Sequence, residues 1–189
     1  MKQDGPNTLP RIVETERTRL SPWVTLCAKH VLNDEGGEAA VYHSLEQSDY
    51  VTVFAVRTDG LIPLVRQFRP AVEQFTYELP GGLLDRNEAP ERIATSELFE
   101  ETGHRVVGQP HLMGRLCPDT GRLGNQLWSY FARVVPAEPG AWSPEPEVQS
   151  IAVSAAELKD MIGNGQFQHA LHLGVIGLAL TQGLFSWGE

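Results

Sequence analysis

The chain has 189 residues, of which 41% are hydrophobic, enough for one globular domain with its own core and a small extra subdomain. The formal net charge of −9 argues against nucleic acid or an anionic membrane surface as the main partner. No apolar run approaches the roughly 20 residues of a membrane span, no signal peptide is evident, and Cys27 and Cys117 form no CxxC pattern, so we expect a reduced, cytoplasmic protein.

Residues 1–45 predict a small antiparallel β subdomain. Residues 1–9 are polar, and we expect them to be frayed. Strand-like stretches follow from residue 11, with a hairpin turn expected at Asn33–Gly37. The aliphatic side chains of this segment are sparse, so we expect it to pack on another surface, and a second subunit is the partner that we favour.

Residues 46–189 predict a larger domain of strands and helices. Asp59-Gly60 separates two apolar stretches and predicts a two-residue hairpin between them. The capping-box pattern at 154–157 predicts a short helix, and a mostly apolar helix is expected over about 168–185. The expected strands cover about 50–56, 61–68, 75–79, 105–116, 126–135 and 148–154, with a proline-rich loop at 135–147. Strands with two or three packed helices predict an α/β sandwich.

A helix is also predicted between residues 87 and 103. Asn87 is a suitable N-cap, Pro90 is tolerated in the first turn, and Gly103 is expected to end the helix in a left-handed conformation.

Three carboxylates share one face of this helix, because Glu97, Glu100 and Glu101 are three or four residues apart. Like charges at that spacing repel, so the cluster does not stabilise the helix. Carboxylate oxygens gathered on one face are the ligands that Mg²⁺ prefers in proteins. The pattern therefore favours a metal site over a merely solvated acidic face.

The stretch from Gly82 to Gly103 resembles the Nudix box, G-x5-E-x7-R-E-U-x-E-E-x-G-U, in which U is aliphatic. The matching residues are Gly82, Glu88, Glu97, Leu98, Glu100, Glu101 and Gly103. Two positions depart from the pattern, since Ser96 stands in place of arginine and His104 in place of an aliphatic residue. The resemblance implies a Nudix-type α/β/α sandwich with a mixed sheet over residues 46–189, beside the N-terminal antiparallel β subdomain.

The resemblance implies that the helix holds one to three Mg²⁺ ions, with Mn²⁺ as an alternative, which polarise a diphosphate and activate water. The metal ligands expected from it are Glu97, Glu101, Glu100 and the backbone carbonyl of Gly81, and Glu100 and Glu101 are also expected to be catalytic. Ser96 cannot hold Glu100 as an arginine would, and Arg92 lies about 12 Å away along the helix. We therefore expect weaker orientation of the ligands rather than loss of the site.

The sequence before the box, with Arg66, Arg69 and the stretch Glu78-Leu-Pro-Gly-Gly, resembles the ADP-ribose pyrophosphatase branch of the family. That resemblance implies that Arg66 and Arg69 contact substrate phosphates and that Glu78 lies near the nucleotide or metal. The alternative is a solvated strand edge with ordinary charges. An acidic protein needs local cations to bind a diphosphate, which favours the functional interpretation.

The proline-rich loop carries two acids in the region where the branch has a general base or water-orienting group. We expect Glu147 to fill that role ahead of Glu145, although the helix carboxylates could act without either. The branch also grips an adenine with aromatic side chains across a swapped homodimer, and Trp23 and Tyr42 fall in that region. Packing in a core or interface is the alternative for both. The six histidines show no convincing metal-ligand spacing, and we expect them to be structural or surface residues.

The resemblance therefore implies a Mg²⁺-dependent hydrolase of the diphosphate bond of a nucleoside diphosphate sugar. ADP-ribose is the first candidate substrate, and the products would be AMP and a sugar phosphate. Another sugar nucleotide, such as GDP-mannose or UDP-glucose, is the first alternative. The second alternative is a non-hydrolysing nucleotide-binding protein of the same fold, which Ser96 supports.

Overall fold

The computed structural model describes residues 10–33 and 37–188, so the expected frayed segment 1–9 and the centre of the Asn33–Gly37 turn lie outside it. The chain forms two compact units, one of Met1–Ser48 with Cys117–Asn125 and one of Asp49–Leu116 with Gln126–Glu189. A later segment of the chain thus joins the N-terminal unit. The roles expected for residues 1–45, in dimerisation and in a nucleotide pocket, stay predictions.

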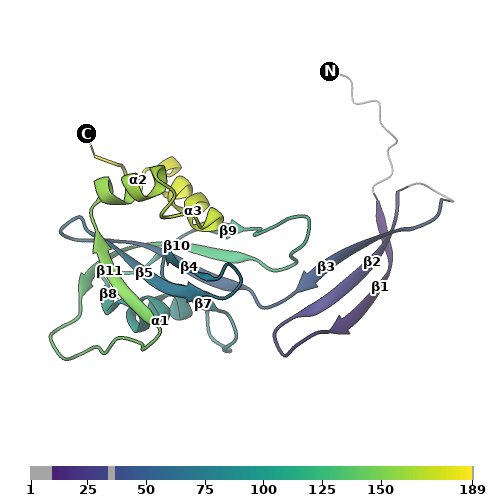
Figure 1. Ribbon diagram of the computed structural model, residues 1–189, viewed down its shortest axis with the longest axis horizontal. Helices are drawn as coiled ribbons and strands as arrows, with labels where there is room; N and C mark the ends of the chain where they lie inside the picture. The colour runs from purple at the N-terminus through teal and green to yellow at the C-terminus, as the bar shows by residue number, and fades with distance from the viewer. Residues whose placement is uncertain (1–9, 34–36, 189) are drawn as a thin grey trace, which may run out of the picture. The chain divides into compact units, whose positions relative to one another are not determined.

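The first unit is a three-stranded antiparallel sheet, as the sequence predicts. Its strands are β1 (Arg11–Arg19), β2 (Thr25–Leu32) and β3 (Ala40–Glu46), in the order β1-β2-β3 (Figure 1). Among the residues of these strands only Cys27 is buried. The sheet has too few large aliphatic side chains for a core of its own, which explains why its faces remain largely open to solvent.

The second unit contains two further sheets and three helices. Its first four strands are β4 (Tyr50–Arg57), β5 (Ile62–Arg69), β6 (Gln74–Glu78) and β7 (Gly81–Leu83). The remaining elements are α1 (Pro90–Thr102), β8 (His104–Val106), β9 (His111–Leu116), β10 (Leu127–Pro136), β11 (Val148–Val153), α2 (Ala155–Gly163) and α3 (Ala170–Thr181). One sheet has the order β7-β4-β10-β8 with β9 also paired to β10, and the other has the order β11-β5-β6. The first sheet is mixed, because β4 and β10 run parallel while its other pairs are antiparallel.

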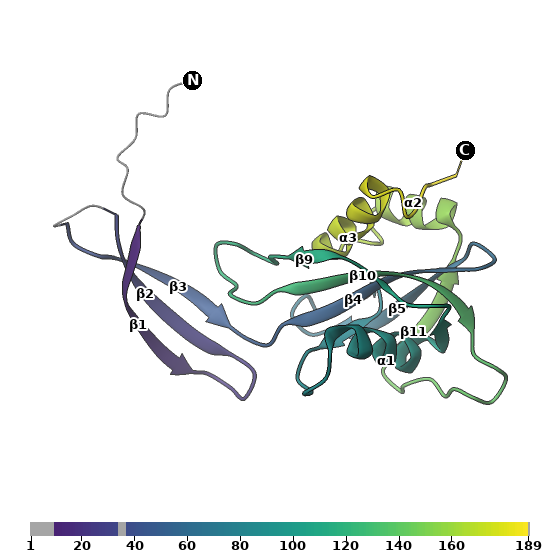
Figure 2. The ribbon, with the colours of Figure 1, turned by 180° about the vertical axis from the view of Figure 1, so that it is seen from behind.

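The central strand β4 is buried on both faces, which makes this unit a three-layer sandwich. Val51, Val53 and Ala55 pack in a core with residues of α1, whereas Phe54 and Val56 pack in a core with residues of α2 and α3. Successive side chains of a strand point to opposite faces, so the two sets alternate along β4. Figure 2 shows α1 on one side of the strands and α2 and α3 on the other. The expected α/β/α sandwich with a mixed sheet is confirmed.

The Asp59-Gly60 turn exists, but the predicted hairpin is wrong. Gly60 has a positive φ of 90°, and the N–H of Arg57 donates to the carbonyl of Leu61 at 2.7 Å. Beyond that bond β4 and β5 diverge into different sheets. A turn signal specifies the reversal of the chain but not the pairing, which is decided by packing against the two helical layers.

The helix boundaries follow their caps. The N-cap of α1 is Ala89 rather than the expected Asn87, because Pro90 at the first helical position already supplies a favourable φ and removes one unpaired donor. Gly103 ends α1 at a φ of 68°, as predicted. The expected capping box of α2 is present between Ser154 and Glu157. The expected strand at 105–116 is split into β8 and β9, and α3 is shorter than predicted. Across residues 10–33 and 37–188, no helix has the length and hydrophobicity needed to cross a membrane.

Candidate active site

The box helix and the turn before it bring Glu101 against Gly81. Glu101 is only 7% exposed, and its Oε2 accepts a hydrogen bond of 2.8 Å from the backbone N–H of Gly81. Burial raises the pKa of Glu101 to about 8, and the charges of Glu97 and Glu145 act in the same direction against the Gly81 hydrogen bond. Burial and the neighbouring negative charges disfavour the ionised form of Glu101, so a nearby cation would stabilise it.

The two glycines of the turn allow this close approach. A Cβ on Gly82 would lie 2.5 Å from the Cδ atom of Glu97, and a Cβ on Gly81 would lie 2.1 Å from the carbonyl oxygen of Val51. Any side chain at either position would therefore displace the carboxylate or the neighbouring strand. The N–H of Gly81 is used by Glu101, and the expected role of its carbonyl as a metal ligand stays a prediction.

Arg86, which the sequence interpretation missed, lies on the carboxylate face of α1. Its Nη2 is 2.9 Å from Oε1 of Glu97 and 3.6 Å from Oε2 of Glu100. Burial and the charge of Glu100 raise the pKa of Glu97, and the charge of Arg86 opposes them. The Glu97 side chain is 15% exposed and the Glu100 side chain 43%. The sequence feature that could have indicated this contact is the position of Arg86 inside the five-residue gap between Gly82 and Glu88 of the box.

The box carboxylates have the chemistry of a Mg²⁺ site, although their oxygens do not meet at one point. Glu101 faces Gly81, while Glu97 and Glu100 face Arg86. Within residues 10–33 and 37–188, two groups of three His, Cys, Asp or Glu residues have ligand atoms that all lie within 4.8 Å of one another. They are Glu78-His169-His172 and Glu14-Glu16-His30. The donor set of the box is entirely carboxylate oxygen, which suits a hard divalent cation. A bound divalent cation would offset the repulsion between Glu97 and Glu100, and it would lower the raised pKa of Glu101.

Of the two acids in the proline-rich loop, Glu145 is the one whose charge acts on the box helix. Glu145 is among the groups whose charge raises the pKa values of Glu97 and Glu101. The expectation ranked Glu147 first, because sequence spacing alone cannot say which of two neighbouring acids in a loop faces the helix. The catalytic role of either acid stays a prediction.

The exposed Arg69 forms an ion pair with the buried carboxylate of Glu78 beside the turn. Nε and Nη2 of Arg69 donate to the two carboxylate oxygens of Glu78 at 2.8 and 2.7 Å, and the Thr76 hydroxyl donates to Oε1 at 2.6 Å. Burial alone would raise the pKa of Glu78, but the hydrogen bonds from Arg69 and Thr76 lower it to about 2. Glu78 is thus the fixed partner that orients Arg69.

Arg66 and Arg69 do not converge, although both were expected at the substrate phosphates. Arg66 lies three residues before Arg69 on β5, so the two side chains leave opposite faces of the strand. The Arg66 guanidinium lies 4.1 Å from the centre of the Phe75 ring, and its Nη1 donates to Gln149 at 3.4 Å. Arg69 shares its face with Glu78.

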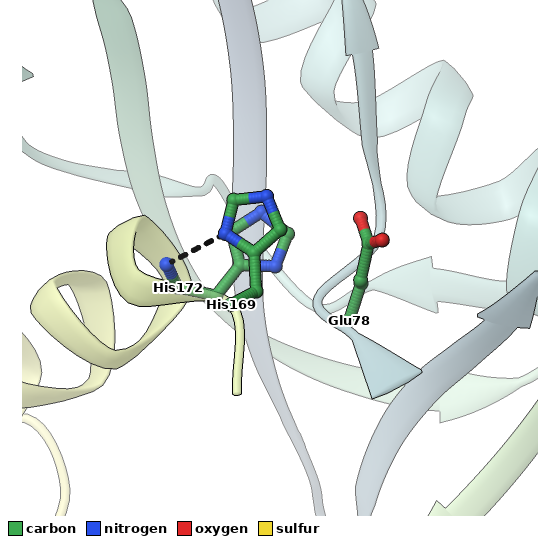
Figure 3. A group of neighbouring side chains, drawn as sticks. All are labelled: Glu78, His169 and His172. Atoms are coloured by element: carbon green, nitrogen blue, oxygen red, sulfur yellow. Dashed lines mark hydrogen bonds between the residues drawn. The ribbon is translucent and has the colours of Figure 1, made fainter. Parts of the chain in front are cut away.

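His169 and His172 stack beside Glu78, a group that the sequence interpretation missed (Figure 3). Their ring centres are 3.8 Å apart and their planes differ by 13°. Burial lowers the pKa of His169 and lowers that of His172 to about 3, so both rings are neutral at pH 7. The only available signal was the spacing of three residues at the start of a helix, and Glu78 lies more than ninety residues away along the chain.

Each ring of the histidine pair accepts a backbone hydrogen bond at Nδ1. Nδ1 of His172 accepts from the N–H of Leu79 at 3.0 Å, and Nδ1 of His169 accepts from the N–H of His172 at 3.5 Å. A neutral ring that accepts at Nδ1 carries its proton on Nε2. A histidine nitrogen binds a metal ion in the plane of its ring. Because the two rings are stacked, an ion in the plane of one ring lies outside the plane of the other. The carboxylate of Glu78 is already hydrogen-bonded to Arg69.

Two adjoining cavities lie along these residues, and both are formed by the second unit alone. The first has a volume of about 180 Å³ and borders the box turn. It is lined by Tyr50, Val51, Arg69, Glu78, Leu79, Gly81, Gly82, Leu83, His169 and His172. The second, of about 350 Å³, is lined by Arg69, Ala71, Val72, Gln74, Thr76, Glu78, Gln168 and His169. Arg69, Glu78 and His169 line both, so they mark the junction of the two spaces.

Trp23 and Tyr42 lie in the first unit. Trp23 follows β1 and is 69% exposed, and Tyr42 lies on β3 opposite Lys29 and is 55% exposed. Their exposure is compatible with stacking on a base, and that role stays a prediction.

Comparison with known proteins identifies relatives over part of the chain. It is similar to an ADP-ribose pyrophosphatase of Bacillus subtilis (strain 168), 40% identical over 68 residues, which are 36% of this chain and 37% of that protein. It is similar to an ADP-sugar pyrophosphatase of Mus musculus, 45% identical over 64 residues, 32% of this chain and 29% of that protein. The aligned segments thus span about a third of the length of these curated relatives.

A solved structure described as "Crystal structure of ADP compounds hydrolase" matches with a TM-score of 0.75 and 20% identity, over 93% of this chain and 94% of that one. At this identity the match shows the fold alone. The model of the NUDIX domain matches residues 47–171, which is more than half of the chain and contains the box, the ion pair and the turn. The chain therefore belongs to the NUDIX domain family.

Proposed function

We propose that the protein hydrolyses the diphosphate bond of a nucleoside diphosphate sugar in a reaction that depends on Mg²⁺ or Mn²⁺. The observation that carries this proposal is the carboxylate cluster of α1 beside a cavity that contains Arg69. The names of the similar proteins, ADP-ribose pyrophosphatase and ADP-sugar pyrophosphatase, support ADP-ribose as the first substrate to test. The products would then be AMP and a sugar phosphate.

Glu97, Glu100 and Glu101 would hold the metal. When bound, a divalent cation neutralises the phosphoryl oxygens and lowers the pKa of a bound water. Glu101 contributes the most, because burial and its charged neighbours hold its pKa near 8 until a cation offsets them. Gly81 and Gly82 let this carboxylate and that of Glu97 lie against the backbone.

Arg69 would bind a phosphoryl oxygen of the substrate. Glu78 fixes the guanidinium by two hydrogen bonds, so little side-chain entropy is lost when Arg69 meets an anion. The Nε2–H groups of His169 and His172 add neutral donors to the same cavity. Oxygen-rich substrates such as diphosphates and ribose match a cavity lined by donors.

Glu145 would orient the attacking water. Its charge acts on Glu97 and Glu101, so it lies near the metal ligands. Glu147 is the second candidate for this role. A general base contributes on the order of a hundredfold to ten-thousandfold to a hydrolysis.

The proposal is tested by turnover on a panel of ADP-ribose, GDP-mannose and UDP-glucose with Mg²⁺, followed by separation of the products. We expect ADP-ribose to be cleaved fastest, to AMP and a sugar phosphate. Fastest cleavage of another sugar nucleotide would reassign the base preference. Binding of a sugar nucleotide without turnover at saturating Mg²⁺ and Mn²⁺ would show a non-hydrolysing binding protein and overturn the proposal.

A further inference from the structure

A single guanidinium group touches two of the box carboxylates, although the position usually held by arginine is occupied by Ser96. We propose that Arg86 is the positioning residue of the carboxylate cluster, holding Glu97 and Glu100 in the arrangement that binds the metal. This inference rests on the metal-dependent reaction proposed above. It concerns how the ligands are held and not which substrate is cleaved.

The geometry of Arg86 suits this role. Its Nη2 lies 2.9 Å from Oε1 of Glu97 and 3.6 Å from Oε2 of Glu100, so one nitrogen spans both carboxylates. Glu97 and Glu100 raise the pKa of Arg86, which shows that both act on it electrostatically. The 2.9 Å hydrogen bond fixes the orientation of the Glu97 carboxylate, because an N–H donor must point at the oxygen that accepts it, and the 3.6 Å ion pair holds Glu100 nearby by charge attraction.

The other cation of the box segment cannot replace Arg86. Residues 82–103 contain two arginines and no lysine, and the structure describes all of them. Arg92, the second arginine, lies in the first turn of α1, and its Nε is 3.6 Å from Oε2 of Glu88, which precedes the helix. Ser96 is too short to reach a carboxylate one turn away.

The chain enters the helix by a route that brings Arg86 to the cluster. β7 ends at Leu83 and α1 begins at Pro90, so the intervening loop folds back over the carboxylate face of the helix. An arginine in the helix would reach Glu100 along the helix axis, whereas Arg86 reaches it from this loop. Arg86 therefore stands at a different position from the arginine of the family pattern, but it still forms an ion pair with the box carboxylates.

The loss of Arg86 has two opposite effects on a bound cation. Removing a positive charge next to the ligands favours cation binding by simple electrostatics. Removing the donor lets Glu97 and Glu100 turn away from each other, because their like charges repel. Partners that orient metal ligands are worth about 10- to 100-fold in affinity. Weaker binding in the absence of Arg86 therefore reports on positioning and cannot arise from the charge change.

The inference is tested by titrating Mn²⁺ into the full chain without substrate and following free Mn²⁺ by electron paramagnetic resonance. We expect Arg86→Ala to weaken Mn²⁺ binding by about 10- to 100-fold. Arg86→Lys, which keeps the charge but replaces the planar fork by one ammonium group, should also bind more weakly than the wild type. Arg92→Ala is the matched control and should bind like the wild type.

A second variant tests whether the two positions are equivalent. Adding Ser96→Arg to Arg86→Ala places an arginine four residues before Glu100, and we expect it to restore most of the lost affinity. Circular dichroism of each variant verifies that the helix content is unchanged. Wild-type affinity or tighter binding in Arg86→Ala overturns the inference while leaving the proposed reaction intact. If the wild-type protein binds no Mn²⁺ without substrate, the inference of a cluster held ready for the metal by Arg86 is overturned, and the proposed reaction is decided by the turnover assay.

Discussion

The indole Nε1 of Trp142 donates a hydrogen bond of 2.9 Å to the backbone carbonyl of Glu100 in the box helix. The same ring lies against Gly103, where a Cβ atom would approach it to 2.6 Å. The N–H of Ala137 also donates to the carbonyl of Gly103 at 2.8 Å. The loop that carries Glu145 is therefore fastened to the last turn of α1, and the open carbonyls of that helix end supply the acceptors.

Trp142→Phe should lower turnover by roughly ten- to hundredfold, because it keeps the ring but releases the loop that places Glu145. The lost hydrogen bond should cost only about 1 kcal/mol of unfolding free energy. Steady-state kinetics and thermal melts of the same preparation separate the two effects. Trp187→Phe, at a tryptophan whose ring packs edge-on against Phe185, is the matched control. Equal turnover in the two variants would rule out a positioning role for Trp142.

Glu97→Gln and Glu101→Gln should each lower turnover by on the order of a hundredfold or more with the fold intact, because each removes one anionic metal ligand. Turnover is measured at saturating Mg²⁺, and melts monitor folding. Glu91→Gln, an exposed acid in the first turn of the same helix, should behave like the wild type. Retained activity in both ligand variants would mean that the metal is held elsewhere.

The two loop acids can be told apart by their glutamine variants. We expect Glu145→Gln to lower turnover by on the order of a hundredfold or more, and Glu147→Gln to have a much smaller effect. The reason is that the charge of Glu145 reaches Glu97 and Glu101. Comparison of kcat for the two variants at saturating substrate decides the assignment. The reverse order of effects would return the role to Glu147.

The buried His172 should make the protein less stable in mild acid. Its folded-state pKa is lowered to about 3 by burial and by the neighbouring charges of His169 and Arg69, which outweigh that of Glu78. The unfolded chain therefore binds a proton that the folded chain does not. The resulting stability is complete above the unfolded pKa of about 6.5 and is lost as the pH falls from there towards 3.

Urea unfolding at several pH values between 6.5 and 4.5 measures this slope. His172→Asn keeps an acceptor for the Leu79 N–H but cannot be protonated, so we expect a shallower loss of unfolding free energy over that range. Glu78, with a pKa of about 2, adds its own loss mainly at lower pH. An unchanged slope in the asparagine variant would contradict the assignment to His172.

We expect the protein to form a homodimer through its N-terminal sheet. Large apolar side chains of this unit are open to solvent, namely Ile12, Val13, Leu20, Trp23, Val41 and Tyr42. Such exposure is common at protein interfaces. Light scattering of the intact chain should give the mass of a dimer, and a chain lacking residues 1–45 should give that of a monomer. A monomer at micromolar concentration for the intact chain would refute the prediction.

The sequence predicted the box helix well because its signals are local. Glu97 and Glu101 share a face by helix periodicity, and Gly103 ends the helix because only glycine accepts its backbone conformation without strain. Arg86 was missed because its contact crosses a loop and follows no period. The two arginines of β5 are a different case. Their odd spacing places the two side chains on opposite faces of a strand, so a shared phosphate site is implied only by the family resemblance.

The histidine pair and the sheet pairing could not be predicted from local patterns. His172 meets Leu79 through the packing of α3 against β4 and its neighbours, which depends on the whole core. Likewise, the turn at Gly60 could not reveal that β5 would join β11 and β6 rather than β4. Both outcomes depend on contacts between segments far apart along the chain.

The separation of β4 and β5 into different sheets determines how the cavity can deform. Glu78 ends a strand of one sheet, Gly81 begins a strand of the other, and only Leu79 and Pro80 lie between them. The N–H of Leu79 is tied to His172 of α3, and the carbonyl of Pro80 accepts from the N–H of Val53 at 2.9 Å. This dipeptide bridge is anchored on both sides, which restrains the two walls of the cavity from moving apart. We therefore expect a ligand larger than the cavity to extend from its open side rather than to spread its walls.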